Sequence, residues 1–163
     1  QESITLLGVV LQSNCKFSLH IKNKLFNANK CLFIIRSLRK EGYDQEEIDH
    51  LFNSLVLPKL LYALPVYSAS VSDLTVVQSF LTRCYKRRYT SVLYNIYNLV
   101  EKHDRRLVNK INNNNHPLFS MLPETKLSSK RLRKLSCFRP KINTERFKNS
   151  FFNRIIFNYD VVL

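Results

Sequence analysis

The chain has 163 residues, with 26 Lys and Arg against 12 Asp and Glu, which gives a net charge of +14 at pH 7. Its hydrophobic fraction of 45% is typical of globular proteins and excludes a wholly disordered chain. The most apolar stretch, residues 55–67, is interrupted by two prolines and a lysine, so no membrane span of about 20 residues is expected. Such a charge favours a polyanionic partner, nucleic acid before an anionic membrane surface.

The cysteines and the N-terminus indicate an intracellular protein. No C-x-x-C pair and no nearby His at ligand spacing occurs among the four cysteines, which disfavours both a zinc site and a secreted disulfide scaffold. The chain starts with Gln1 and no basic-then-apolar leader follows, so we expect no secretory signal and a segment from within a longer protein. Cytoplasm and nucleus are the expected compartments. The four cysteines, expected to be buried free thiols, are Cys15, Cys31, Cys84 and Cys137.

Residues 4–11, I-T-L-L-G-V-V-L, predict one short β-strand. Gly8 lies inside it, where glycine usually marks a bulge or a close backbone approach. No other segment has a convincing strand pattern, so this strand is expected to lack a partner within the chain.

A long helix is predicted from Ser18 to about Gly42, a residue well suited to end it. Apolar residues recur there at steps of three and four, which is the pattern of a helix with one buried face. The members of that stripe are Phe17, Ile21, Leu25, Ala28, Leu32 and Ile35. Beside it runs a polar ridge of Lys22, Asn29, Arg36 and Lys40.

A second helix is predicted to begin at Asp44, which forms a capping box with Glu47. Negative charge in this first turn is favourable because of the helix dipole. Pro58 is predicted to kink or end the helix, with a restart at residues 60–62 as an alternative to termination. The expected buried side consists of Ile48, Leu51, Phe52, Leu55 and Val56.

Two further helices are predicted. The third is capped by Ser72 or Asp73, and its expected inward residues are Leu74, Val77, Leu81 and Cys84. A basic block of Arg83, Lys86, Arg87 and Arg88 lies at its end. The fourth is expected from about residue 91 to the asparagine run 112–115, with Leu93, Ile96, Leu99 or Val100, His103, Leu107 and Ile111 inward.

The C-terminal quarter is strongly basic. From Lys126 to the end, ten Lys and Arg face two acids, which predicts a partly extended arm, followed by a short amphipathic segment with Phe147, Phe151 and Ile155. We therefore divide the chain into a strand and turn (1–14), a helical bundle (15–89), a helical connector (90–122) and a basic arm with a short terminal helix (123–163).

No catalytic centre is predicted. Gly8 and Gly42 are the only glycines, which excludes a phosphate-binding glycine loop. The one cluster of acids, at residues 46–49, lies in the first turn of a helix, which favours a capping role over a metal site. His103 and Asp104 are neighbours that point about 100° apart on a helix, and Asp104 is expected to pair with Arg105 or Arg106. We expect no metal and no cofactor in this chain.

Three separate basic regions favour nucleic-acid binding: the ridge, the block and the arm. One charged helix face is usually only a solvated face, but three weigh against that interpretation. The interleaved Tyr85, Tyr89, Phe138 and Phe147 could stack on bases or equally belong to the core. The predicted binding residues are Lys22, Arg36, Arg39, Lys40, Arg83, Lys86, Arg87, Arg88, Lys130, Arg131, Arg133 and Lys134.

The N-terminal half resembles part of a known family. The string L-L-G-V-V-L-Q-S-N-C-K-F-S-L-H-I resembles the segment after the palm of LINE-type (non-LTR) retrotransposon reverse transcriptases, where a strand with Leu-Gly leads into a helix opened by aromatic-x-x-His-Ile. Residues 28–40 look like the first thumb helix of that family. The matching residues of the first string are Leu7, Gly8, Phe17, His20 and Ile21.

Three later segments extend the resemblance in the same order. Residues 51–67 are similar to the thumb signature F-x-S-L-x-x-P-x-L-x-Y-A-x-P-x-W, with Tyr67 in place of the Trp. Residues 76–87 resemble the V-Q-x-x-x-x-R segment, and residues 149–156 resemble N-S-F-x-x-x-x-I. The linker after Arg88 is shortened and residues 94–98 depart from the pattern, as in an eroded or recombined copy.

The resemblance implies a mostly α fold: a thumb-like helical bundle with one short strand left from the palm and a basic C-terminal region. It implies a chain that grips the RNA/DNA primer–template duplex beside an upstream palm. The family's catalytic aspartates lie in an F-A-D-D-like hairpin that this sequence lacks, so Mg²⁺ would belong to the parent polymerase. The alternatives are a stand-alone or domesticated helical nucleic-acid-binding or interaction protein, and a non-functional remnant of the element.

Overall fold

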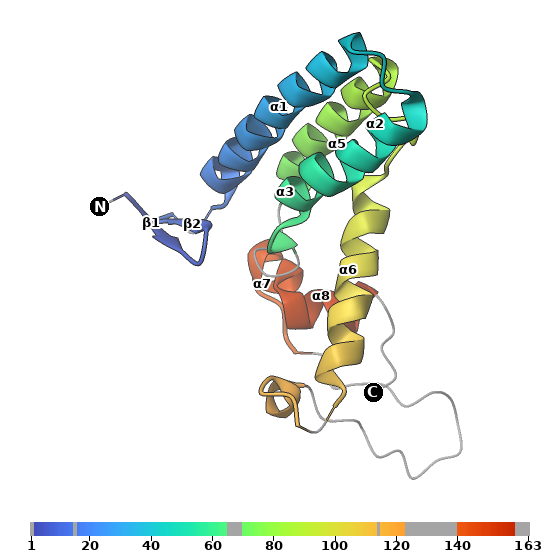
Figure 1. Ribbon diagram of the computed structural model, residues 1–163. Helices are drawn as coiled ribbons and strands as arrows, with labels where there is room; N and C mark the ends of the chain where they lie inside the picture. Colours follow the sequence, from blue (N-terminus) through green and yellow to red (C-terminus); the bar gives the residue numbers. More distant parts are fainter. Residues whose placement is uncertain (1, 15, 65–69, 114, 123–139, 159–163) are drawn as a thin grey trace. The chain divides into compact units, whose positions relative to one another are not determined.

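A computed structural model describes residues 2–14, 16–64, 70–113, 115–122 and 140–158, and they are mostly α-helical, as predicted (Figure 1). The chain divides into two units. The first comprises residues 1–64 and 69–100, and the second comprises residues 65–68 and 101–163. In the described part of the chain, no helix combines the length and the apolar character needed to cross a bilayer.

The N-terminus forms a hairpin of two antiparallel strands, β1 (Ser3–Leu6) and β2 (Val9–Gln12). Leu7 and Gly8 connect them with φ angles of 47° and 75°, the left-handed pair that a tight two-residue hairpin turn requires. The prediction of one unpartnered strand is therefore wrong. Gly8 is half of a turn and not a bulge, and the second half of the apolar run pairs with the first.

Polar contacts fasten this hairpin to helix α1 (Ser18–Lys40). The backbone N–H of Val10 donates to Nδ1 of the buried His20 at 3.2 Å. Gln12 accepts from the backbone N–H of Leu19 at 3.0 Å. Burial, together with the positive charge of Lys24, lowers the pKa of His20 to about 4, so the ring is neutral near pH 7 and can accept the bond.

Helix α1 confirms the predicted first helix. Its buried residues are His20, Ile21, Ala28, Cys31, Leu32 and Ile35. Gly42 ends the helix as predicted, with a φ of 101°. The N–H of Gly42 donates to the carbonyl of Arg39, and the N–H of Tyr43 donates to the carbonyl of Leu38. These two bonds form a Schellman motif, in which a left-handed residue allows the last carbonyls to be satisfied.

The second predicted helix runs through Pro58 without ending there. It comprises α2 (Gln45–Leu51), a π-helical stretch η1 (Phe52–Val56) and α3 (Leu57–Leu61). The predicted capping box of Asp44 and Glu47 is present, with bonds of 2.8 and 3.0 Å. The wide π-turn precedes the proline, whose missing N–H and ring bulk would disrupt a regular α-helix.

Helix α5 (Val71–Lys86) packs against α1. Its N-cap is Ser70, slightly earlier than the predicted Ser72 or Asp73, because the Ser70 hydroxyl accepts from the backbone N–H of Asp73. The predicted inward residues are buried, and Phe80 joins them.

Helix α6 (Ile96–Ile111) begins later than the expected residue 91. Side chains from other helices hold the preceding segment outside the helix. Asp49 accepts from the N–H and the hydroxyl of Ser91, and Gln78 binds the carbonyl of Tyr94 and the N–H of Ile96. Leu93 is consequently exposed, and not in the core as predicted.

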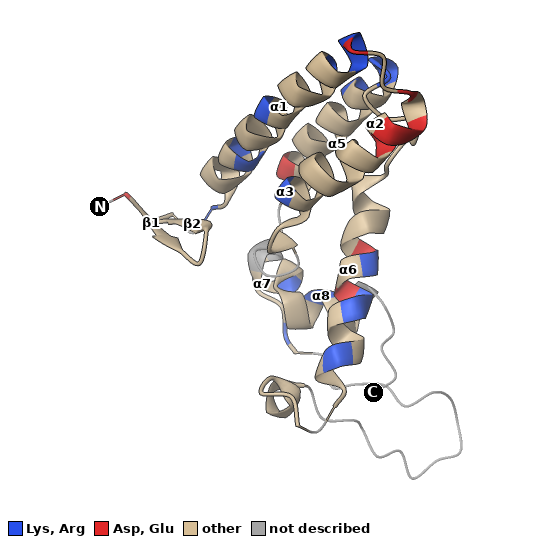
Figure 2. Cartoon of the chain, viewed as in Figure 1, with Lys and Arg blue, Asp and Glu red and all other residues tan. Residues whose placement is uncertain are grey.

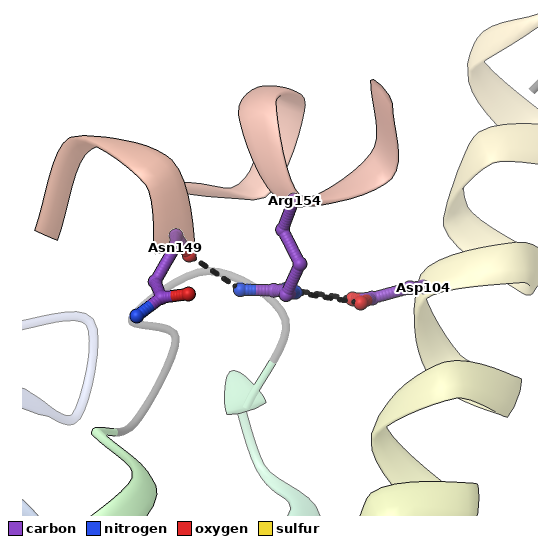
Figure 3. Close-up of polar contacts among 3 residues, drawn as sticks. All are labelled: Asp104, Asn149 and Arg154. Carbon is purple, nitrogen blue, oxygen red and sulfur yellow. Dashed lines mark hydrogen bonds and ion pairs between the residues drawn. The ribbon is translucent and has the colours of Figure 1, made fainter. Parts of the chain in front are cut away.

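The second unit contains most of α6, the short 3-10 helix η2 (Phe119–Met121), α7 (Glu145–Asn149) and α8 (Phe151–Asn158). Asp104, expected to pair with a neighbour on its own helix, binds Arg154 of α8 through two bonds of 2.7 and 2.8 Å (Figure 3). Arg154 also donates to the carbonyl of Asn149 at 2.8 Å. Arg105 pairs with Glu101 at 2.8 Å.

Candidate nucleic-acid interface

The C-terminal ends of α1 and α5 lie together and carry a group of cations, here called the basic end. Arg39 Nη1 donates to the carbonyl of Arg88 at 2.8 Å and to that of Arg87 at 3.3 Å, which joins the two helix ends. Figure 2 shows the blue cationic positions at this end of both helices. The basic end consists of Arg36, Arg39, Lys40, Lys86, Arg87 and Arg88.

The end of α5 has an unusual chain reversal that presents these arginines. Arg88 has a φ of 56°, a region that favours glycine or asparagine. Its N–H donates to the carbonyl of Tyr85 at 2.9 Å, and the N–H of Tyr89 donates to that of Cys84 at 3.0 Å. This is again a Schellman motif, and it leaves the carbonyls of Arg87 and Arg88 available to the Arg39 guanidinium.

The positive charge of the basic end exceeds what the helix ends can neutralise. Each helix C-terminus carries about half a negative charge, so the two ends, together with the carboxylate of Glu41 at the C-cap of α1, offset roughly two of the six cations. Within the described residues, none of the six forms an ion pair with a carboxylate. Of the nearby acids, Glu41 is the C-cap of α1, and others lie in the first turn of α2 (Figure 2). A polyanion can therefore bind here without first displacing a carboxylate.

Two of the six cations also have structural contacts. Arg39 is half-buried and holds the α5 carbonyls, and Arg36 lies over the buried Tyr89 ring, with its Cζ 5.8 Å from the centroid. The side chains of Lys40, Lys86, Arg87 and Arg88 are exposed. These four are the residues best placed to contact phosphates.

An open groove of about 410 Å³ extends the basic end along α5. Hydroxyl, amide and cationic side chains line it, the types that contact phosphates in nucleic-acid complexes. Thr75 and Ser79 already donate to carbonyls of their own helix, and Gln78 is occupied by Tyr94 and Ile96. The cations and the Thr82 hydroxyl, which only accepts from Gln78, are therefore the groups left to contact phosphate. The lining residues are Thr75, Gln78, Ser79, Thr82, Arg83, Lys86 and Arg87.

The outer face of α1 adds two exposed aromatic rings that were missed from the sequence. Phe26 and Phe33 are 62% and 69% exposed, and the Lys30 ammonium lies 4.5 Å from the Phe26 ring centroid. Exposed rings beside cations can stack on unpaired bases. The sequence did contain a signal for them: Phe26 and Phe33 are seven residues apart, as are Lys22 and Asn29 of the polar ridge, which places the rings on the same side of the helix.

The structure gathers some predicted binding residues and separates others. Lys22 lies near the beginning of α1, 18 residues before Lys40, which is about 27 Å along the helix axis. Arg83 lies about one turn before the end of α5, within the same groove. Lys130, Arg131, Arg133 and Lys134 lie outside the described residues, as does Phe138. Of the interleaved aromatic residues, Tyr89 is buried, whereas Tyr85 and Phe147 are exposed.

The remaining reactive groups have structural positions. Among the residues that the structure describes, no three His, Cys, Asp or Glu side chains group as metal ligands would. Cys31 and Cys84 are buried free thiols, as predicted, and burial raises the pKa of Cys84 to about 11 despite Arg83 and Arg87. Cys15 and Cys137 lie outside the described residues.

Comparison of the chain with protein-family models, with curated proteins and with solved structures gives no match.

Proposed function

We propose that this chain binds the backbone of a nucleic-acid duplex through the basic end, as the thumb of a non-LTR retrotransposon RNA-directed DNA polymerase. The observation that carries the proposal is the joining of α1 and α5 by Arg39, which gathers six cations on one surface. The ordered resemblance of residues 6–87 to the post-palm and thumb segments supplies the family.

In this function the cations contact phosphates and make no sequence-specific contacts with the bases. Lysine and arginine bind phosphate oxygens and release condensed counterions, so the affinity falls steeply with salt and depends little on sequence. The thumb holds the primer–template duplex of RNA and DNA, while nucleotide transfer with Mg²⁺ belongs to the palm. The exposed apolar side chains of Ile4, Leu6 and Leu7 support contact of the hairpin with that palm.

The test is duplex binding as a function of salt. Fluorescence anisotropy with a labelled RNA–DNA hybrid is measured for the chain and for a triple variant, Lys40→Gln, Lys86→Gln and Arg87→Gln. Each lost phosphate contact lowers the salt slope by about 0.9, so the triple variant should lose up to roughly 3. Its affinity at low salt should fall about tenfold or more.

A matched control separates the surface from net charge. Lys102, Arg106 and Lys110 of α6 are exposed, and their triple change to Gln removes the same charge. We expect this control to retain most of the affinity and the salt slope. Equal losses in the two triple variants, or tight binding that is insensitive to salt, would contradict the proposal. Hybrid, duplex DNA and single-stranded RNA probes establish the preferred nucleic acid.

The hairpin favours a second candidate, a stand-alone helical nucleic-acid-binding protein. Because β1 and β2 pair with each other, the apolar run does not need a strand from a palm. The hairpin is further held by Tyr62, whose hydroxyl donates to the carbonyl of Leu7 at 2.6 Å. Cooperative unfolding of the isolated monomer, with slow amide exchange at Val10, would favour this candidate over a thumb.

A further inference from the structure

A second groove, of about 360 Å³, lies between α1 and the η1–α3 stretch of the first unit. Two lysine side chains from different elements, Lys24 and Lys59, line it together with an amide and a hydroxyl, and no carboxylate is among the lining residues. The apolar part of the wall is supplied by Leu55, Pro58 and the ring of Tyr62. The remaining lining residues are Asn27 and Ser54.

The two lysines form an uncompensated pair of charges. The Lys24 ammonium lies 4.2 Å from the centroid of the Tyr62 ring, which fixes it in the groove. Burial, and next the positive charge of Lys59, lower the pKa of Lys24. Within the described residues neither lysine has a carboxylate partner. An anion between them would offset both the burial and the repulsion.

We propose that this groove binds a phosphate group, carried by the end of a nucleic-acid strand or by a free nucleotide. Two ammonium groups and the Asn27 amide can all donate to phosphate oxygens, and hydrogen bonds from charged donors are the strong ones. The Ser54 hydroxyl donates to carbonyls of its own helix, so it contributes little. The volume falls in the range of small-ligand sites, which leaves room for a sugar against Leu55 and Pro58.

This site is distinct from the basic end and does not rest on the proposed function. Lys24 precedes Arg39 by 15 residues in α1, a separation of about 22 Å along the axis. The groove is also built differently: its cations share a pocket wall with apolar groups, whereas those of the basic end surround two exposed helix ends. The groove can therefore bind phosphate even if the basic end does not bind a duplex, and the basic end can bind a duplex even if the groove does not bind phosphate.

The first measurement needs no variant. The pKa of Lys24 is followed by NMR of the lysine side chains in the full chain, during titration with inorganic phosphate. We expect a saturable rise of that pKa toward its ordinary value, because the anion stabilises the charged form. The Lys22 and Lys30 signals, from the outer face of α1, should not move. If the pKa of Lys24 does not change during the phosphate titration, the proposal is overturned.

The second measurement identifies the source of the phosphate. Binding of a 5′-phosphorylated oligonucleotide, its 5′-hydroxyl counterpart and a nucleoside monophosphate is compared. A strand-end site prefers the phosphorylated oligonucleotide by about tenfold or more, and a nucleotide site prefers the monophosphate by a similar factor. Either preference supports a phosphate site. Equal binding of the two oligonucleotides, with no binding of the monophosphate, contradicts it.

Variants then connect the binding to the groove. The double change Lys24→Gln and Lys59→Gln should abolish the phosphate preference, whereas Lys102→Gln with Lys110→Gln, which removes the same charge from exposed positions of α6, should retain it. The basic-end triple variant should also retain it, which separates failure of this site from failure of duplex binding. A Lys24/Lys59 variant that folds and still prefers phosphate overturns the proposal.

Discussion

The guanidinium of Arg154 meets the carboxylate of Asp104 through two parallel hydrogen bonds, with both side chains buried (Figure 3). The pair connects α8 to α6 across 50 residues of sequence, and Asp104 is 0% exposed. Removing one member deprives the other buried charge of its oppositely charged partner. A buried ion pair is therefore costly to break even where its net contribution to stability is small.

Asp104→Asn should lower the free energy of unfolding of the second unit by about 3–5 kcal/mol, measured by urea denaturation. The double change Asp104→Leu with Arg154→Met should recover most of that loss, because neither charge remains buried. Glu101→Gln is the surface control: it breaks the exposed pair with Arg105, which costs about 1 kcal/mol or less. A larger loss for Glu101→Gln than for Asp104→Asn would contradict this interpretation.

Arg39→Met should destabilise the first unit by about 1–2 kcal/mol, because it removes the charged donor that satisfies the carbonyls of Arg87 and Arg88. Methionine preserves the apolar stem, so packing changes little. Lys40→Met, at the exposed neighbouring position, should change stability by about 0.5 kcal/mol or less. Thermal unfolding of the two variants tests the difference, and equal melting temperatures would argue against a structural role of Arg39.

The stability of the chain should fall as the pH decreases from about 6.5 to about 4. In this interval the unfolded state binds a proton at His20 and the folded state does not, because the folded pKa is about 4. The loss is roughly 2–3 kcal/mol, and it levels off below pH 4. His103, whose pKa burial also lowers, contributes with the same sign.

His20→Asn isolates the contribution of His20. The asparagine oxygen can accept from the N–H of Val10 but does not titrate, so the slope of stability against pH between 6.5 and 4 should become smaller. Urea denaturation at four or five pH values gives this slope. An unchanged slope in the variant would show that His20 is not the titrating group.

Leu7→Asn should stabilise the hairpin by about 0.5–1 kcal/mol. Leucine is strained at a φ of 47°, whereas Asn-Gly is the preferred pair for this turn. The Leu7 side chain is 83% exposed, so little packing is lost, and the bond from Tyr62 goes to the backbone. Amide exchange of the hairpin should slow. Leu7→Val, which is β-branched at the same φ, should accelerate it.

The features that the sequence predicted are those that a short window encodes. The stripe of α1, the end of that helix at Gly42 and the Asp44–Glu47 capping box each depend on residues within a few positions. The basic block could be predicted from the sequence for the same reason. Its union with the end of α1 was not, because it depends on one side chain binding carbonyls 48 and 49 residues away.

The features that were missed depend on tertiary packing or on an uncommon local conformation. Leu-Gly is a weak turn signal, because leucine rarely adopts a left-handed φ. The hairpin was therefore predicted as one strand. The partner of Asp104 lies 50 residues away. The groove of Lys24 and Lys59 requires knowing which face of α3 meets α1, and nothing in the spacing of either helix fixes that.

The π-helical stretch at Phe52–Val56 makes this chain sensitive to length at one place. Deleting a single residue there could convert the wide turn into regular α-helix without unravelling it. Each side chain that follows in this helix would then rotate by about 100° about the helix axis. Lys59 would leave the groove and Tyr62 would release the hairpin turn, although neither residue had been altered. The wide turn at Phe52–Val56 thus sets the rotation of α3 that places Lys59 in the groove and Tyr62 at the hairpin turn.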